Sequence, residues 1–159
     1  MRIGAGGSPV KGKKAAGILF TDGTKILLLK RSNEGDHGNT WSLPGGKGKD
    51  GETEIGNAIR ETKEETGVKS IPGHRIDSLS NQNGRQKFTC FIYKVSEIFD
   101  VNLSNEHTDW EWVDIKSLGS KELHPKLKEE MPRYLRSIMR KIKKFSEWAS
   151  FNATIHSLL

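Results

Sequence analysis

The chain has 159 residues and a formal net charge of +6, which fits one basic globular domain. Its hydrophobic residues, 33% of the total, form no run near the roughly 20 residues of a membrane-spanning helix, so we expect no membrane association. A single cysteine, Cys90, excludes an internal disulfide and favours a reducing cytoplasm, although a disulfide-free secreted protein fits the same count. The basic balance suggests anionic partners such as phosphates or nucleic acid, but excess lysine also serves solubility.

The first segments predict a short lead-in followed by a β-hairpin. Residues 1–12 are rich in glycine and lysine and lack the apolar stretch of a signal peptide, so we expect a flexible lead-in. Strands are predicted at Ala15–Thr21 and Lys25–Arg31, joined by a tight "DGT" turn. Both are almost continuously apolar, as in strands covered on both faces. A polar loop follows, and then "WSLPGGKGKDGE", whose glycine density predicts a shaped loop.

A helix is predicted from Thr53 to Gly67, with Gly67 as its C-cap. The residues expected to face the core follow helical spacing and are Ile55, Ala58, Ile59 and Thr62.

The remaining elements predict a mixed sheet with helices packed on its faces. We expect strands at Lys87–Val95 and Asp109–Ile115, the second with Trp110 and Trp112 on one face. A long basic helix is expected from about Leu127 to Trp148. Residues 13–148 therefore form one predicted domain, and residues 149–159 are expected to be a C-terminal tail.

Three glutamates, Glu61, Glu64 and Glu65, crowd one edge of the first helix beside its apolar stripe. Like charges at this spacing repel one another and destabilise a helix, so the clustering of these glutamates suggests a functional role. Converging carboxylates suit a hard divalent cation, above all Mg²⁺, and the neighbouring loop can bring Lys47 or Lys49 to phosphate oxygens. The loop is not a P-loop, because no Ser or Thr follows a Gly-Lys pair. The alternative interpretation is a solvated acidic helix face.

The spacing of residues 46–68 decides between these interpretations. The order is Gly46, five residues, Glu52, seven residues, Arg60 and Glu61, two residues, Glu64 and Glu65, one residue, and then Gly67 and Val68. This pattern resembles the signature of the Nudix hydrolase family at every fixed polar and glycine position. Thr62 departs from it, since an aliphatic residue is usual there, and we expect a slightly weaker core contact. The flanking "AAGILF", "LLLKR", "WSLPGG" and "EH…WEWV" extend the resemblance.

The resemblance implies an α/β fold, the Nudix α/β/α sandwich with a central mixed β-sheet and a loop–helix–loop catalytic motif. It implies hydrolysis of a nucleoside diphosphate linked to a further group X, with Mg²⁺ or Mn²⁺ as the cofactor. By position, Glu64 and Glu65 would be metal ligands together with the backbone carbonyl of Gly46. Glu61 would be a metal ligand or the base that activates water.

The resemblance also assigns supporting residues. Arg60 would hold the glutamates in position, and Glu52 would support the junction of loop and helix. Glu106 is our candidate for an outlying metal ligand or base, against the alternative of a solvated loop glutamate. His37 is a candidate substrate contact together with Lys47, although loop polarity explains His37 equally well.

The tryptophans Trp41, Trp110 and Trp112 could stack on a base, but strand tryptophans more often belong to the core.

The motif sets the reaction and leaves the substrate open. A proline typical of ADP-ribose hydrolases and a tyrosine typical of dinucleoside-polyphosphate hydrolases are both missing from "LSNQNGR". By elimination we expect a nucleoside triphosphate, hydrolysed to nucleoside monophosphate and pyrophosphate, with ADP-ribose or a nucleotide sugar as the alternative.

Two further hypotheses remain. The basic C-terminal helix suggests RNA 5′ pyrophosphohydrolysis, but its cations surround the helix rather than forming a stripe, which favours simple solvation. A nucleotide-sensing domain without catalysis is disfavoured because all the motif glutamates are present. The oligomeric state, monomer or homodimer, is left undetermined.

Overall fold

The computed structural model describes residues 3–4, 6–7, 13–143 and 145–159. Most of the lead-in expected at residues 1–12 lies outside these residues. Its described part is one antiparallel pair of two-residue strands, β1 (Ile3–Gly4) and β2 (Gly6–Gly7).

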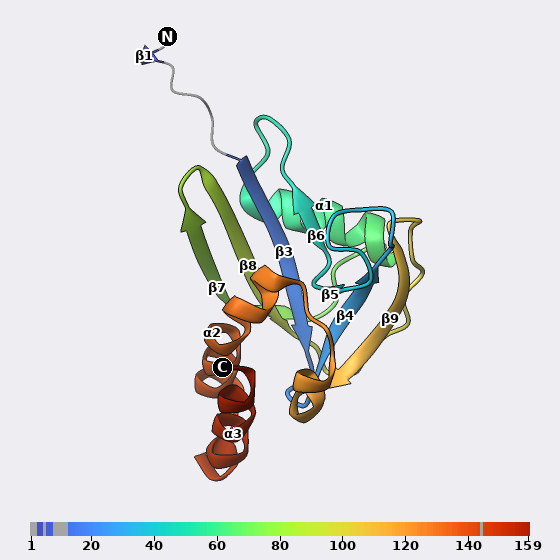
Figure 1. Ribbon diagram of the computed structural model, residues 1–159, viewed down its shortest axis with the longest axis vertical. Helices are drawn as coiled ribbons and strands as arrows, with labels where there is room; N and C mark the ends of the chain where they lie inside the picture. Colours follow the sequence, from blue (N-terminus) through green and yellow to red (C-terminus); the bar gives the residue numbers. More distant parts are fainter. Residues whose placement is uncertain (1–2, 5, 8–12, 144) are drawn as a thin grey trace.

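A seven-stranded mixed sheet forms the centre of the molecule (Figure 1). Its strands are β3 (Lys13–Thr21), β4 (Lys25–Arg31), β5 (Trp41–Ser42), β6 (Gly45–Lys47), β7 (His74–Asn83), β8 (Gln86–Lys94) and β9 (His107–Asp114). The main order is β5-β4-β3-β8-β7, with β6 paired to β3 and β9 paired to β4. The β3–β8 pairing is parallel and the other pairings are antiparallel.

Helices cover both faces of this sheet, which confirms the predicted α/β architecture. The helical segments are α1 (Glu54–Thr66), η1 (Ile115–Ser120), α2 (Pro125–Ile142), η2 (Phe145–Glu147) and α3 (Trp148–Leu158). In Figure 1, α1 lies on one face, and α2 with α3 lies on the other. None of the helices in the described part of the chain combines the length and apolar character needed to cross a membrane.

The two predicted hairpin strands divide their side chains between two cores, because alternate residues of a strand face opposite sides. Leu19 and Leu28 belong to the cluster beneath α2 and α3. Ile18 and Leu27 belong to the cluster beneath α1, together with Ala58. The prediction that these strands are covered on both faces is therefore confirmed, and the sheet holds α1 at a fixed place.

The predicted long helix ends earlier than expected. Helix α2 stops at Ile142, and the backbone of Lys143 is extended. The residues expected to be a tail instead form α3, whose Phe151, Ile155 and Leu158 are buried in the core shared with α2. Their i, i+4 and i+7 spacing is the reason, since it gives the short helix an apolar side that packs on the domain.

Strand β7 was missed by the sequence prediction. It pairs with β8 through nine residue pairs and ends at Asn83, and Gly84 in the connecting turn has φ 63°. The dipeptide Asn83–Gly84 is a strong hairpin signal, but the flanking segment is too polar to show a strand pattern.

The tryptophans belong mainly to the core. Trp41 and Trp112 are buried, and Trp110 packs partly buried against the same cluster as Trp112. The Trp112 indole N–H donates to the carbonyl oxygen of Phe99 at 2.8 Å. The core interpretation therefore fits Trp41 and Trp112, and both strand tryptophans lie on one face as predicted.

Candidate active site

Helix α1 has well-defined ends, which fix the positions of its glutamates. The side chain of Thr53 caps the first turn by accepting a hydrogen bond from the Gly56 N–H at 3.1 Å. Gly67 ends the helix in the left-handed conformation, with φ 77°, and its N–H donates to the carbonyl of Lys63. Both ends agree with the sequence prediction.

The glycine-rich loop lies directly against this helix. Strand β6 carries the loop and pairs with β3, where Gly46 lies opposite Ala16. A Cβ on Gly46 would lie 2.7 Å from the Glu61 carboxylate, so a larger residue there would displace that side chain. The N–H of Gly45 donates to Glu65 Oε1 at 2.9 Å. The loop and the helix therefore enclose the two glutamates between them.

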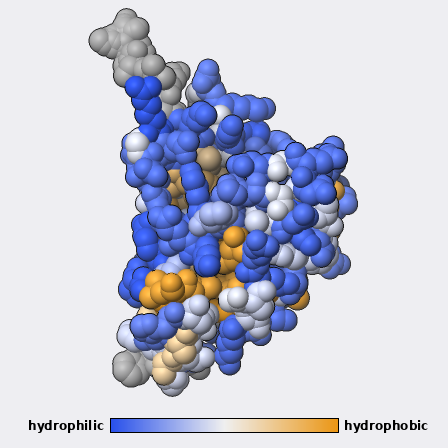
Figure 2. All heavy atoms as spheres, in the orientation of Figure 1, coloured by the Kyte–Doolittle hydropathy of each residue, from blue (hydrophilic) through white to orange (hydrophobic). Residues whose placement is uncertain are grey.

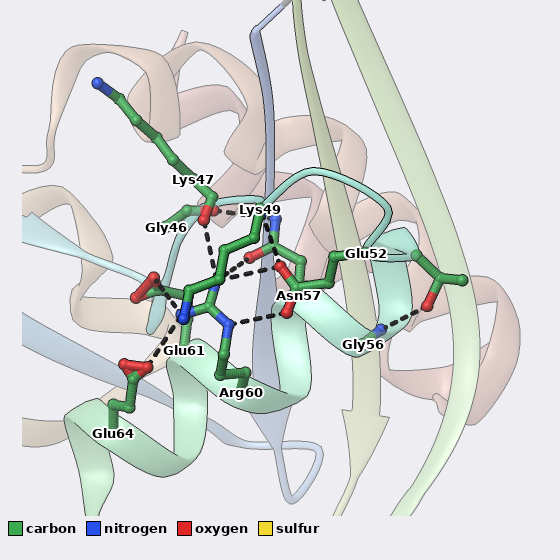
Figure 3. Close-up of polar contacts among 10 residues, drawn as sticks. Gly46, Lys47, Lys49, Glu52, Gly56, Asn57, Arg60, Glu61 and Glu64 are labelled. Atoms are coloured by element: carbon green, nitrogen blue, oxygen red, sulfur yellow. Dashed lines mark hydrogen bonds and ion pairs between the residues drawn. The ribbon is translucent and has the colours of Figure 1, made fainter.

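Arg60 joins three carboxylates and the loop (Figure 3). Its Nε donates to Glu52 at 2.8 Å, while Nη1 donates to Glu64 at 2.9 Å and to Glu61 at 3.3 Å. Its Nη2 donates to the carbonyl of Lys47 at 3.1 Å. These contacts hold Glu61 and Glu64 in one orientation, as the expected positioning role requires.

Glu52 bridges the loop and the helix. Besides Arg60, it accepts a hydrogen bond from the Lys49 N–H at 2.9 Å. The Arg60 hydrogen bond, and then that of Lys49, lower the pKa of Glu52 to about 2, so this carboxylate stays charged. Glu64 has a half-exposed side chain and lies at the rim of the site.

Asn57 is a site residue that the sequence prediction missed. It is 2% exposed, its Nδ2 donates to the carbonyl of Gly46 at 3.2 Å, and its Oδ1 accepts from Arg60 at 3.5 Å. Asn57 thereby orients the peptide whose carbonyl the family resemblance makes a metal ligand. The sequence signal for a site role of Asn57 was its polar side chain directly before Ala58, a residue expected to face the core.

Glu65 is buried, contrary to the expectation that all three glutamates lie apart from the core stripe. Seven residues at 3.6 per turn place it within about 20° of Ala58, which explains its exposure of only 4%. Burial, and then the nearby charges of Glu61 and Glu106, raise the pKa of Glu65 to about 9, against the opposing hydrogen bond from Gly45.

The fold brings Glu106 beside Glu65, although the two are far apart in sequence. One potential ligand atom each from Glu65, Glu106 and His107 lies within 4.8 Å of the others. Burial, and then the charge of Arg31, lower the pKa of His107 to about 4, so its imidazole is neutral near pH 7. His107 was not singled out from the sequence; its position directly after Glu106 was the only signal.

This donor set fits a divalent cation. An oxygen of Glu65 and an oxygen of Glu106 lie within 4.8 Å of each other, and two carboxylates this close repel unless a proton or a cation lies between them. Glu61 adds a third carboxylate whose pKa is raised, chiefly by burial and also by Glu64 and Glu106. Carboxylate oxygens are the ligands that Mg²⁺ and Mn²⁺ prefer.

A cleft of about 850 Å³ lies along the loop and is lined by Gly45, Gly46 and Lys47. Glu61, Glu64, Glu65 and Glu106 do not line this cleft. Gly45 and Gly46 line it and also contact Glu65 and Glu61. Its other cationic lining residues are Lys13, Lys14, Arg31, Lys87 and Lys126. Figure 2 shows apolar atoms recessed among hydrophilic residues in the upper half of one face, above a larger apolar patch at the surface.

His37 also lines this cleft, as does Lys47, whereas Lys49 does not. The ring of His37 packs edge-on against that of His124, with 4.6 Å between the ring centroids. His124 Nδ1 accepts the N–H of Lys126 at the start of α2. The structure therefore places both predicted substrate contacts where a ligand of the cleft would meet them.

Comparison with known proteins identifies the family. The family model described as "NUDIX domain" matches residues 11–137. This chain belongs to the NUDIX domain family. The Nudix motif of the family resemblance thus coincides with the α1 site, and the mixed sheet between helices is the Nudix fold.

Relatives of this Nudix chain have different named substrates. The asymmetrical bis(5′-nucleosyl)-tetraphosphatase of Mus musculus is 35% identical over 99 residues, which cover 57% of this chain and 65% of that protein. A putative 8-oxo-dGTP diphosphatase 3 of Mycobacterium tuberculosis is 28% identical over 125 residues, covering 70% of this chain and 56% of that protein. In both cases the match spans less than two thirds of the relative.

Solved structures give the same family. The MutT protein of Methanosarcina mazei Go1 superposes with a TM-score of 0.62 and 28% identity, covering 81% of this chain and 97% of that one. A C. elegans Ap4A hydrolase in a binary complex gives a TM-score of 0.56 and 26% identity, covering 89% and 98%.

Proposed function

We propose that this Nudix domain hydrolyses a phosphoric anhydride bond of a nucleoside polyphosphate and depends on Mg²⁺ or Mn²⁺. The observation that carries the proposal is the cluster of Glu61, Glu65 and Glu106 against the glycine loop, at the edge of a basic cleft. Gly46 lines the cleft and also lies against the Glu61 carboxylate, so the cleft and the carboxylates adjoin at this residue.

In this proposal Glu65 and Glu106 would hold the cation together with the Gly46 carbonyl, Glu64 would contribute from the rim, and Glu61 is left as the base. When bound there, the cation would supply charge neutralisation of phosphoryl oxygens and a lower pKa of a water. Asn57 keeps the Gly46 carbonyl in place, and Arg60 fixes Glu61 and Glu64.

Glu61 is the proposed general base. Its pKa is raised, chiefly by burial and against the opposing charge of Arg60, which makes the carboxylate a better proton acceptor. The water oxygen attacks phosphorus while its proton passes to Glu61. The anhydride P–O bond breaks, and its electron pair leaves with the departing phosphate.

Two substrate classes fit the cleft. A nucleoside triphosphate is the class expected by elimination from the sequence. A dinucleoside tetraphosphate is the second candidate, because the mouse relative named for that substrate is 35% identical and the cleft is large for a binding site. In either case Lys14, Lys47 and Lys87 would meet the phosphates, and His37 lines the same cleft.

The test is a substrate panel with Mg²⁺ or Mn²⁺, scored by the products. It contains nucleoside triphosphates, dinucleoside tetraphosphate, ADP-ribose, nucleotide sugars and triphosphorylated RNA. We expect turnover that disappears with EDTA and in Glu65→Gln, while the same substitution at exposed Glu97 leaves it unchanged. Absence of turnover on every compound, or full activity of Glu65→Gln, would refute the proposal.

A further inference from the structure

The beginning of β9 contains a β-bulge that redirects His107. Lys30 of β4 pairs with Asp109, but the next residue, Arg31, pairs with His107, so Thr108 has no residue opposite it. One extra residue inverts the alternation of side chains along a strand. Trp110 and Trp112 face the core beneath α1, and regular alternation would place His107 on the opposite face. The bulge turns His107 toward the α1 face, where Glu65 lies.

His107 is built into this position and is not a surface residue. Its side chain is buried, with 7% exposure, and its Nδ1 has no hydrogen-bond partner among the described residues. Burying a nitrogen without a partner costs free energy, so such an atom in a folded protein calls for a specific reason. A group of possible ligands lies next to this ring, because one of its nitrogens lies within 4.8 Å of oxygens of Glu65 and Glu106.

We infer that His107 supplies a nitrogen ligand to the cation held by Glu65 and Glu106. The backbone supports this arrangement on both sides. The N–H of Ser32 donates to the Glu106 carbonyl at 3.0 Å, and the N–H of Gly45 fixes one Glu65 oxygen. The second Glu65 oxygen, a Glu106 oxygen and the imidazole then form a mixed donor set.

This donor set changes which metal the site selects. An all-carboxylate site suits Mg²⁺, whereas an imidazole nitrogen favours transition-metal ions over Mg²⁺. The inference rests on the proposed metal-dependent function and narrows its cofactor to a transition-metal ion, of which Mn²⁺ serves as the spectroscopic probe. Turnover is not needed to detect the difference.

The direct test is pulsed electron paramagnetic resonance on the full chain loaded with Mn²⁺ alone. A coordinated imidazole gives ¹⁴N modulation of the electron spin echo, and we expect this signal in the parent and not in His107→Gln. The Mn²⁺ affinity of His107→Gln should fall about tenfold, while the Mg²⁺ affinity from competition changes less than twofold. His156→Gln, which changes an exposed histidine on α3, is the matched control and should keep both the signal and the affinity.

Absence of ¹⁴N modulation in the parent overturns the inference even if every variant fails to fold. It is also overturned if His107→Gln, folded by circular dichroism, loses Mg²⁺ and Mn²⁺ affinity equally. The proposed function fails separately, since a chain that shows the nitrogen signal but hydrolyses no nucleotide supports the metal ligand and refutes the enzyme.

Discussion

Glu65→Gln is expected to stabilise the metal-free protein. The pKa of Glu65 is about 9 in the folded chain and 4.5 as its ordinary value, because the side chain is buried beside Glu61 and Glu106. Between these pH values the folded state keeps a proton that the unfolded state releases, so stability falls as pH rises. Each pH unit costs about 1.4 kcal/mol, which amounts to about 3 kcal/mol between pH 6 and pH 8.

Glutamine keeps a side-chain oxygen that can accept the Gly45 N–H, but it has no carboxyl group that titrates. In EDTA at pH 8, we therefore expect Glu65→Gln to unfold at higher urea concentration than the parent, with a gain of about 2–4 kcal/mol. The parent should lose stability from pH 6 to pH 8, and the variant should show little of this slope. Saturating Mn²⁺ should stabilise the parent much more than the variant.

The measurement is urea unfolding followed by circular dichroism, at both pH values, with EDTA and with Mn²⁺. Glu64→Gln is the control, because its side chain is 52% exposed and the substitution should leave the pH slope in place. Equal pH slopes in the parent and in Glu65→Gln would refute the reasoning, as would a loss of stability in the EDTA-treated variant at pH 8.

Three other substitutions test the supports of the site. Asn57→Ala removes the buried donor to the Gly46 carbonyl, so the free energy of unfolding should fall by about 1–3 kcal/mol. Titration should also show weaker Mn²⁺ binding, and unchanged metal affinity would contradict the positioning role. Arg60→Gln should lower kcat at least tenfold because Glu61 and Glu64 lose their shared partner, while circular dichroism shows the fold unchanged. A wild-type kcat would contradict the positioning role of Arg60. Gly67→Ala should lower the free energy of unfolding in urea by about 1–3 kcal/mol, because φ is 77° and the new Cβ would lie 2.9 Å from Asn102. The kcat at saturating metal should stay within twofold.

Local patterns made much of the fold predictable from the sequence. The ends of α1 follow from the Thr53 cap and from Gly67, both of which act within one turn of the helix. The two hairpin strands follow from continuous apolar runs around a tight turn. The spacing of glycine, arginine and glutamate carried the family resemblance for the same reason, because the motif occupies one continuous loop and helix.

The sequence failed where a structure depends on packing between distant segments. Strand β7 is too polar to show a strand pattern and exists because it pairs with β8. Helix α3 forms because its apolar side is covered by the domain. Helical spacing puts Glu65 close to Ala58, but its hydrogen bond to the Gly45 N–H comes from a loop outside the helix.

The sequence by itself determined that carboxylates gather on α1 beside a glycine loop, since periodicity and spacing are properties of a continuous segment. Only the tertiary structure decided which groups complete the site. Glu106 and His107 reach Glu65 because β9 pairs with β4, and a single bulged residue, Thr108, sets the face on which His107 lies. Strand pairing and its register arise from contacts across the whole chain, so no local pattern could reveal them.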